Sequence, residues 1–138
     1  MNSVSVRLFF AAGHRILGLT GPGEKCRNPH GHTFHLLATW DQQPGWPPAV
    51  EFGQAKAALR DFIKQCYDHG FFVDKADQAM RDFLEREGCR HTVTNGPPTT
   101  ERLTELLARD IRRLVPNAAL RRLVLEEGPE NSATYECL

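Results

Sequence analysis

Hydrophobic and polar side chains alternate along two stretches of the N-terminal third of the chain, over Ser3–Phe10 and from His30 to Trp40. Successive side chains of a β-strand point to opposite faces, so this period-two pattern predicts two strands. Each strand has one apolar face for a shared core. That face holds Val4, Val6, Leu8 and Phe10 in the first strand, and Phe34, Leu36, Ala38 and Trp40 in the second.

Apolar residues spaced by three and four predict helices further along the chain. Two main helices are expected over Gln54–Asp68 and Thr100–Val115, and a shorter one over Ala76–Glu87 with Gly88 at its C-terminal end. The residues expected to face the core are Leu59, Phe62, Ile63 and Cys66 in the first helix, Ala79, Met80, Phe83 and Leu84 in the short one, and Leu103, Leu106, Leu107, Ile111 and Leu114 in the last.

Short segments predict three further strands, at Ala49–Phe52, Ala119–Glu127 and Ala133–Cys137. Arg90–Thr94 is a short polar stretch that leans toward β-structure, and Tyr67–Asp74 is expected to be a helix end and turn. This order of elements predicts an α+β fold, an antiparallel β-sheet with two main helices packed on one face. The chain has 138 residues, of which 41% are hydrophobic. We therefore expect one domain over residues 1–138.

The charge balance and the absence of a long apolar run argue against several classes of protein. Lysine plus arginine equal aspartate plus glutamate at 17 each, whereas a nucleic-acid binder usually carries a basic excess. No apolar run approaches the roughly 20 residues of a membrane span, and the N-terminus alternates as a strand does rather than as a signal peptide. A cytoplasmic protein is expected. The scattered cysteines Cys66, Cys89 and Cys137 are expected to be small buried residues rather than parts of disulfides.

Three histidines carry the strongest chemical signal. His30 and His32 are two residues apart at the start of a predicted strand, so their side chains share a face, and His14 comes just after the neighbouring strand. Three imidazoles with one open position are typical of catalytic zinc, whereas structural zinc sites are usually closed and rich in cysteine. The spacing alone leaves open both a zinc site and three structural histidines.

Other polar residues could take part in chemistry beside such a metal. Cys26 lies between Lys25 and Arg27, whose charges favour a thiolate, but it could also be a fourth zinc ligand or an incidental loop cysteine. The pair Asp68-His69 suits proton transfer, although a histidine at a helix C-terminus is also favoured by the dipole. Glu127 ends an apolar strand and needs a donor partner, such as a ligand with paired N–H groups, unless it faces solvent.

These residues together resemble a known family. The motifs are Phe10-Ala11-Ala12-Gly13-His14, then Cys26 followed by His30-Gly31-His32, then Asp68-His69, Pro98-Thr99-Thr100-Glu101, and Glu127 with Ala133 and Tyr135. In this order they resemble the 6-pyruvoyl tetrahydropterin synthase / 6-carboxy-5,6,7,8-tetrahydropterin synthase family over nearly the whole chain.

The resemblance implies a role for each matching residue. It implies that His14, His30 and His32 hold a catalytic Zn²⁺, that Cys26 is the catalytic base, and that Asp68 and His69 assist proton transfer. It further implies that Glu127 anchors a pterin ring and that Thr99 and Thr100 approach it. The fold implied is the T-fold, or tunnelling fold, whose subunits join their sheets into a trimeric barrel. Two trimers then stack into a homohexamer, with active sites between subunits.

The spacing of Cys26 and His30 is similar to the bacterial carboxy branch of the family. That similarity implies a lyase converting 7,8-dihydroneopterin triphosphate to 6-carboxytetrahydropterin, acetaldehyde and triphosphate, for queuosine and related 7-deazapurines. Three positions depart from the family's pattern: Gly13 replaces alanine or serine, Glu51 replaces aspartate, and Val73 replaces asparagine. They leave open a pyruvoyl-forming enzyme, a paralogue in specialised metabolism, or a non-catalytic pterin- or zinc-binding protein.

Overall fold

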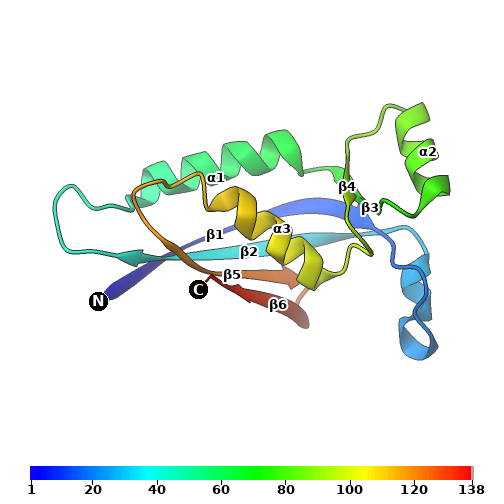
Figure 1. Ribbon diagram of the computed structural model, residues 1–138, viewed down its shortest axis with the longest axis horizontal. Helices are drawn as coiled ribbons and strands as arrows, with labels where there is room; N and C mark the ends of the chain where they lie inside the picture. The colour runs from blue at the N-terminus through cyan, green and yellow to red at the C-terminus, as the bar shows by residue number, and fades with distance from the viewer. Residues whose placement is uncertain (138) are drawn as a thin grey trace.

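A computed structural model describes residues 1–137, and Leu138, the last residue of the expected domain, lies outside the described residues. Strands and helices alternate irregularly along the chain (Figure 1). In order they are β1 (Asn2–His14), the 3₁₀ helix η1 (Gly21–Arg27), β2 (His30–Gln42), α1 (Phe52–Cys66), β3 (Gly70–Asp74), α2 (Gln78–Arg86), β4 (His91–Thr94), α3 (Thr100–Ile111), β5 (Leu120–Glu127) and β6 (Asn131–Glu136).

The two long strands β1 and β2 form the centre of the sheet. They pair antiparallel along their whole length, from Asn2 opposite Gln42 to His14 opposite His30. The first strand therefore runs four residues past its predicted end at Phe10 and includes His14. Its last residues remain extended because they pair with β2 on one side and with β3 on the other.

The sheet is a mixed one, with strand order β4-β3-β1-β2-β5-β6. The expected antiparallel arrangement holds for β1, β2, β5 and β6. At one end β3 pairs parallel to β1, and β4 pairs parallel to β3. The expectation of a helix end and turn over Tyr67–Asp74 is wrong from Gly70 onward. Phe72 and Val73 are both buried, so this strand lacks the alternation that a half-exposed strand shows.

The strand expected at Ala49–Phe52 is wrong as well. Both backbone groups of Val50 bond to the Gln42 side chain, from Val50 N to Oε1 at 3.1 Å and from Nε2 to Val50 O at 2.8 Å. Glu51 is the N-cap of α1, and its carboxylate accepts hydrogen bonds from the N–H groups of Gly53 and Gln54. The Gln42 side chain takes up the backbone groups of Val50 that a neighbouring strand would otherwise bond. The Glu51 carboxylate satisfies free N–H groups of the first turn of α1, so a helix begins here instead of a strand.

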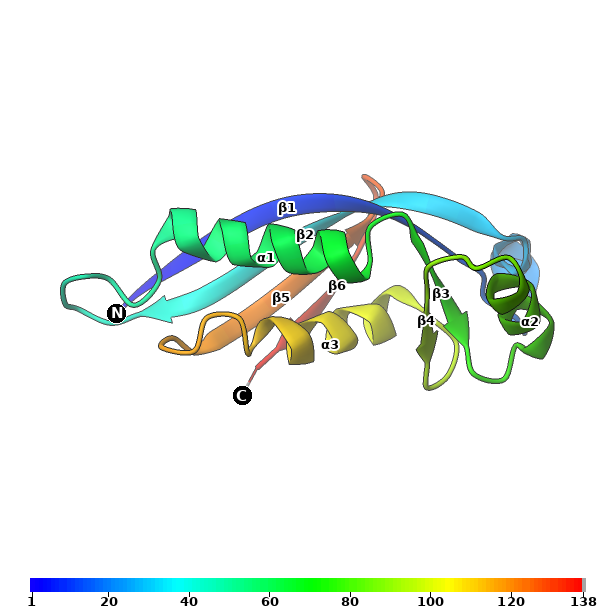
Figure 2. The same ribbon diagram turned by 90° about the horizontal axis from the view of Figure 1, so that it is seen from above.

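Helices α1 and α3 lie on one face of the sheet, as expected (Figure 2). The core lies between them and the apolar faces of β1, β2 and β5. The predicted face of β2 is fully buried, with Phe34, Leu36, Ala38 and Trp40 each 0% exposed. Leu59 and Ile63 of α1, and Leu103, Leu107 and Ile111 of α3, are also buried. The predicted core faces of these elements are therefore confirmed, except that Phe62, Leu106 and Leu114 are half-buried and Cys66 of α1 is exposed.

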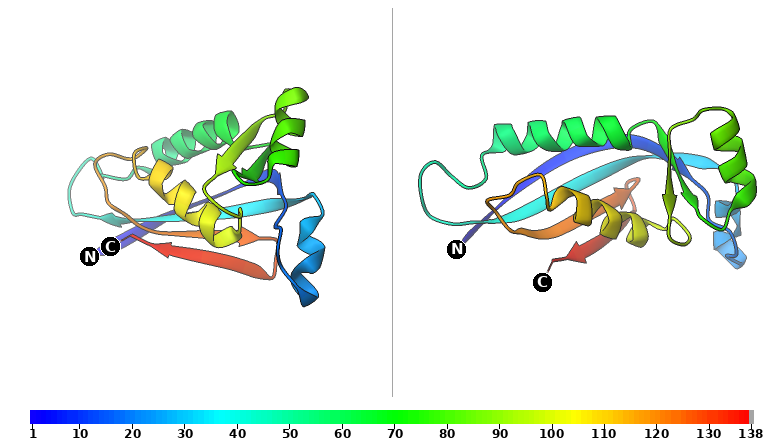
Figure 3. Two further views of the ribbon diagram at one scale, coloured as in Figure 1. Left: turned by 45° about the vertical axis from the view of Figure 1, so that its right-hand side comes forward. Right: turned by 45° about the horizontal axis from the view of Figure 1, so that its top comes forward.

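The short helix α2 packs less deeply than its pattern predicts. Leu84 is buried, but Ala79 and Phe83 are exposed. The expectation of buried cysteines is wrong for Cys66 and Cys89, which are both exposed. Helix α2 and the segments that carry the two cysteines lie at one end of the sheet, where fewer neighbouring side chains cover them. There α2, β3, β4 and η1 gather around the end of β1 (Figure 3). Among residues 1–137, no helix has both the length and the apolarity needed to cross a membrane.

Candidate metal centre

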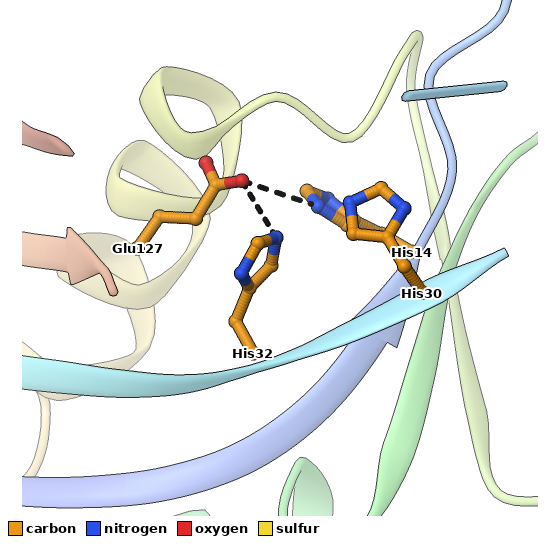
Figure 4. Close-up of side chains that lie close together, drawn as sticks. All are labelled: His14, His30, His32 and Glu127. Carbon is orange, nitrogen blue, oxygen red and sulfur yellow. Dashed lines mark ion pairs between the residues drawn. The ribbon is translucent and has the colours of Figure 1, made fainter. Parts of the chain in front are cut away.

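The register of β1 and β2 brings three histidines together. His14 and His30 are directly opposed across the two strands, and His32 follows two residues later on the same face of β2. The ring centroids lie 4.7 Å apart for His14 and His30, 5.1 Å for His14 and His32, and 4.9 Å for His30 and His32. Side chains far apart in the sequence thus form one cluster (Figure 4).

Backbone carbonyls orient two of these rings. Nδ1 of His14 lies 2.8 Å from the Pro98 carbonyl oxygen, and Nδ1 of His30 lies 2.6 Å from that of Asn28. A carbonyl oxygen can only accept, so Nδ1 carries the proton in both rings. Each Nε2 is then left with a free lone pair. This is the arrangement usually found in metal-binding histidines, whose second nitrogen is held by a carbonyl or carboxylate.

Burial favours the neutral imidazole form of His14 and His32. Desolvation lowers the pKa of His14 and of His32 below the ordinary value, and it outweighs the attraction of the Glu127 carboxylate, which raises both pKa values. Nε2 of His14 and Nε2 of His32 are buried and make no hydrogen bond. An unpartnered buried polar atom costs roughly 1–3 kcal/mol. A divalent cation would satisfy both lone pairs, so the residues present fit a metal ion such as zinc.

Glu127 joins this cluster from the end of β5. Its Oε1 lies 2.7 Å from Nε2 of His32 and 3.6 Å from Nε2 of His14. One ligand atom from each of the three histidines and Glu127 lies within 4.8 Å of all the others. The Thr100 hydroxyl donates a hydrogen bond to Oε2 of Glu127. Thr100 is the first residue of α3 and Thr99 caps that helix, so the positive end of the helix dipole also favours the carboxylate.

Cys26 lies outside the four-residue cluster. It is half-buried in η1, a short helix that the sequence pattern did not predict. Its carbonyl oxygen accepts a hydrogen bond of 2.8 Å from the N–H of Ile16, two residues after His14. The loop that carries the thiol is thereby tied to the end of β1.

Asp68 and His69 are attached to the edge of β1. Asp68 Oδ1 accepts a 3.0 Å hydrogen bond from Ala11 N–H, and the His69 N–H donates to the Ala11 carbonyl at 2.7 Å. Asp68 Oδ2 lies 2.8 Å from Nδ1 of His69. Desolvation, the largest effect, raises the pKa of Asp68, but these hydrogen bonds and nearby charges together bring it below its ordinary value.

His69 is an exposed side chain in a strained backbone conformation. Its side chain is 83% exposed, and its φ of 62° is uncommon for a residue other than glycine. It lines a hollow of about 450 Å³ together with His32, Thr33 and Gly31. Strain of this kind is often found at functional sites.

Sequence reasoning missed several groups that support the site. The carbonyls of Asn28 and Pro98 leave no side-chain signal, because any residue could provide them. The ion pair of Arg15 with Asp77, next to His14, has no recognisable spacing in the sequence. Glu127 was expected as a pterin anchor, and the structure places it beside the three histidines, where it continues the buried face of Leu123 and Leu125.

Comparisons with known proteins agree with this architecture. Residues 3–137 match the family model of 6-pyruvoyl tetrahydropterin synthase. No curated protein matches the chain. An uncharacterized protein from Wolinella succinogenes has a similar structure, with a TM-score of 0.81 and 18% identity over 98% of this chain and 97% of that one.

Two enzymes of known name have the same fold. The 6-pyruvoyl tetrahydropterin synthase of Caenorhabditis elegans is 20% identical over 100% of this chain and 98% of its own, with a TM-score of 0.64. That of Plasmodium falciparum is 12% identical over 96% of both chains, with a TM-score of 0.68. The fold expected from the sequence, the T-fold, is thus confirmed. With the family model matching almost the entire chain, the protein belongs to the 6-pyruvoyl tetrahydropterin synthase family, whose members are lyases.

Proposed function

We propose that the protein is a zinc-dependent lyase that converts 7,8-dihydroneopterin triphosphate to 6-carboxy-5,6,7,8-tetrahydropterin, acetaldehyde and triphosphate, in the synthesis of queuosine or related 7-deazapurines. The observation that carries the proposal is the meeting of three imidazoles at the ends of β1 and β2. Membership of a lyase family supports it, and so does the three-residue gap between Cys26 and His30.

In this proposal His14, His30 and His32 hold the zinc. When bound, the ion supplies Lewis acidity toward oxygen atoms of the substrate side chain. The rings of His14 and His30 are held in place by backbone carbonyls, so these ligands need little reorganisation when they bind. Cys26 accepts a proton from a carbon of the substrate side chain as general base.

Asp68 and His69 act together in proton transfer. The Asp68 carboxylate accepts the Nδ1 proton of His69, which leaves Nε2 of the exposed ring free to exchange a proton with the substrate or solvent. Glu127 accepts N–H groups of the pterin ring, and the neighbouring Thr99 and Thr100 contribute hydroxyl groups to the same contact. A carboxylate that accepts two parallel N–H groups gives both orientation and affinity.

We further propose that copies of the chain assemble through strand β1 into a homohexamer, a dimer of trimers. Within residues 1–137, the side of β1 that faces away from β2 is paired with a strand only at Ala12–His14. Ala11 is bonded on this side to Asp68 and His69, so the residues before Ala11 present an open edge. Phe9, which is 71% exposed, belongs to this part of the strand. Open edges of this length are usually covered in native proteins. A partner edge such as β6 of a second copy would satisfy it, and active sites would then lie between subunits.

The proposal is tested by incubating the zinc-loaded protein with 7,8-dihydroneopterin triphosphate. We expect triphosphate and acetaldehyde in equal amounts, with a product of the mass of 6-carboxytetrahydropterin. Cys26→Ala is expected to keep its zinc and lose turnover by a factor of about 10²–10⁴, the usual contribution of a general base. Cys66→Ala, an exposed cysteine on α1, is the matched control and should leave turnover unchanged.

The names of the similar structures favour one second candidate, a lyase that forms the pyruvoyl product. That enzyme would release triphosphate without acetaldehyde, so the mass of the product separates the two reactions. If neither triphosphate nor acetaldehyde appears with zinc bound and the oligomer intact, both lyase assignments are refuted and a binding protein is left.

A further inference from the structure

Glu127 lies unusually close to the histidines for a residue whose only task is to bind substrate. Its Oε1 is 2.7 Å from Nε2 of His32 and 3.6 Å from Nε2 of His14. All four ligand atoms, one from Glu127 and one from each histidine, lie within 4.8 Å of one another. Neighbouring ligand atoms of a tetrahedral zinc ion are about 3.3 Å apart, given bond lengths near 2.05 Å. The two measured separations fall on either side of that value.

The short separation between Glu127 and His32 is not a hydrogen bond. Nε2 of His32 is buried and has no hydrogen-bond partner, although Oε1 is within reach. Two groups that are close but poorly aligned are expected when both serve the same ion, because each lone pair is then directed at the metal rather than at the neighbouring ligand. The carboxylate also supplies the negative charge that three neutral imidazoles lack.

The rest of the Glu127 side chain is held in the manner of a metal ligand. Its second oxygen, Oε2, accepts a hydrogen bond from the Thr100 hydroxyl, and Thr100 is 7% exposed at the start of α3. This contact leaves Oε1 free on the side of the histidines. Ligating carboxylates are commonly oriented by such hydrogen bonds from residues behind them.

We propose that Glu127 is the fourth protein ligand of the metal in the substrate-free enzyme. This inference rests on the proposed function, since it takes the zinc site of His14, His30 and His32 as its starting point. A site with four protein ligands has no vacant position for a substrate oxygen, so either one ligand leaves or the ion expands to five ligands. The side chain of His14 is 2% exposed and is held in place by burial, whereas those of Glu127 and His32 are 20% and 23% exposed. Of these two, Glu127 is the ligand that exchanges, because its carboxylate also suits the N–H groups of the pterin.

The test measures metal coordination without any substrate. The metal-free protein is titrated with Co²⁺ and Zn²⁺ against a competing chelator, and the visible absorption of the Co²⁺ form is followed while azide is added. We expect Glu127→Gln and Glu127→Ala to bind metal at least tenfold more weakly than the unchanged protein. We expect azide to change the Co²⁺ spectrum of Glu127→Ala at concentrations at least tenfold lower. Circular dichroism confirms that each variant is folded.

Glu126→Gln is the matched control. This neighbour points to the other face of β5, where Oε1 of Glu126 pairs with Arg7 at 3.2 Å, so its metal affinity and azide response should equal those of the unchanged protein. Equal affinity and equal azide response in the Glu127 variants and the control would overturn the inference, while leaving the lyase assay untouched. Conversely, a zinc-loaded protein without lyase turnover would refute the proposed function and leave the coordination result standing.

Discussion

Asp77 joins the end of β1 to the start of α2 and offers a quantitative test of what holds the candidate metal centre in place. Its two carboxylate oxygens accept hydrogen bonds from Nε and Nη2 of Arg15, both at 2.6 Å. Oδ1 also accepts the Met80 N–H at 3.2 Å, which makes Asp77 the N-cap of α2. Arg15 follows His14 directly, so this ion pair fixes the backbone beside a proposed ligand.

The magnitude follows from burial. Removing one partner of a fully buried ion pair costs about 3–5 kcal/mol. The Asp77 side chain is 5% exposed, but that of Arg15 is 21% exposed and can regain some water. We therefore expect Asp77→Asn, which keeps the helix cap, to lower the free energy of unfolding by about 2 kcal/mol. Asp77→Ala loses the cap as well, for a total of about 3 kcal/mol.

The assay is thermal unfolding at pH 7 and one fixed protein concentration, since assembly makes Tm depend on concentration. At about 4 °C per kcal/mol for a domain of this size, Asp77→Asn should lower Tm by about 8 °C and Asp77→Ala by about 12 °C. Asp82→Asn is the matched control, because Asp82 lies on the same helix and bonds only to the exposed Gln78 side chain among residues 1–137. It should change stability by less than about 0.5 kcal/mol.

The pH dependence gives an independent check. The hydrogen bond from Arg15, the largest effect, holds the pKa of Asp77 below its ordinary value. A carboxylate with a lowered folded-state pKa stabilises the fold fully above its unfolded-state pKa of about 3.9 and loses that contribution as the pH falls further. The difference between the unchanged protein and Asp77→Asn should therefore be constant at neutral pH and shrink below about pH 4. Equal costs for Asp77→Asn and Asp82→Asn at pH 7 would refute this reasoning.

Two further predictions concern the backbone and the metal. A Cβ on Gly13 would lie 2.7 Å from Cδ2 of Phe71 and 3.2 Å from the His30 carbonyl, so Gly13→Ala should cost about 1–3 kcal/mol in urea unfolding. Adding Phe71→Ala should recover part of that cost, and strictly additive effects would contradict the steric explanation. Removal of metal by a chelator should lower the Tm of the unchanged protein, because the ion binds the folded state. The Tm of His32→Ala should not change when a chelator is added. If it falls as much as the Tm of the unchanged protein, His32 is not a metal ligand.

The sequence by itself determined the faces of the long elements. Alternation in β1 and β2, and spacing of three and four in α1 and α3, correctly identified most residues of the core. This succeeds because side-chain direction within one strand or helix is a local property of the backbone. The motif of His30 and His32 is local in the same sense, since two residues of spacing on a strand put both imidazoles on one face.

Only the tertiary structure decided which residues meet. Strand β3 exists because Gly70–Asp74 finds partners in β1 and β4, although its own pattern does not alternate. His14 faces His30 because of the register of two strands, and Glu127 reaches them because β5 ends opposite Phe34. The period-two pattern excludes a slip of one residue, which would turn the apolar face outward, but which strands pair and where the start of α3 docks depend on the packing of the whole core.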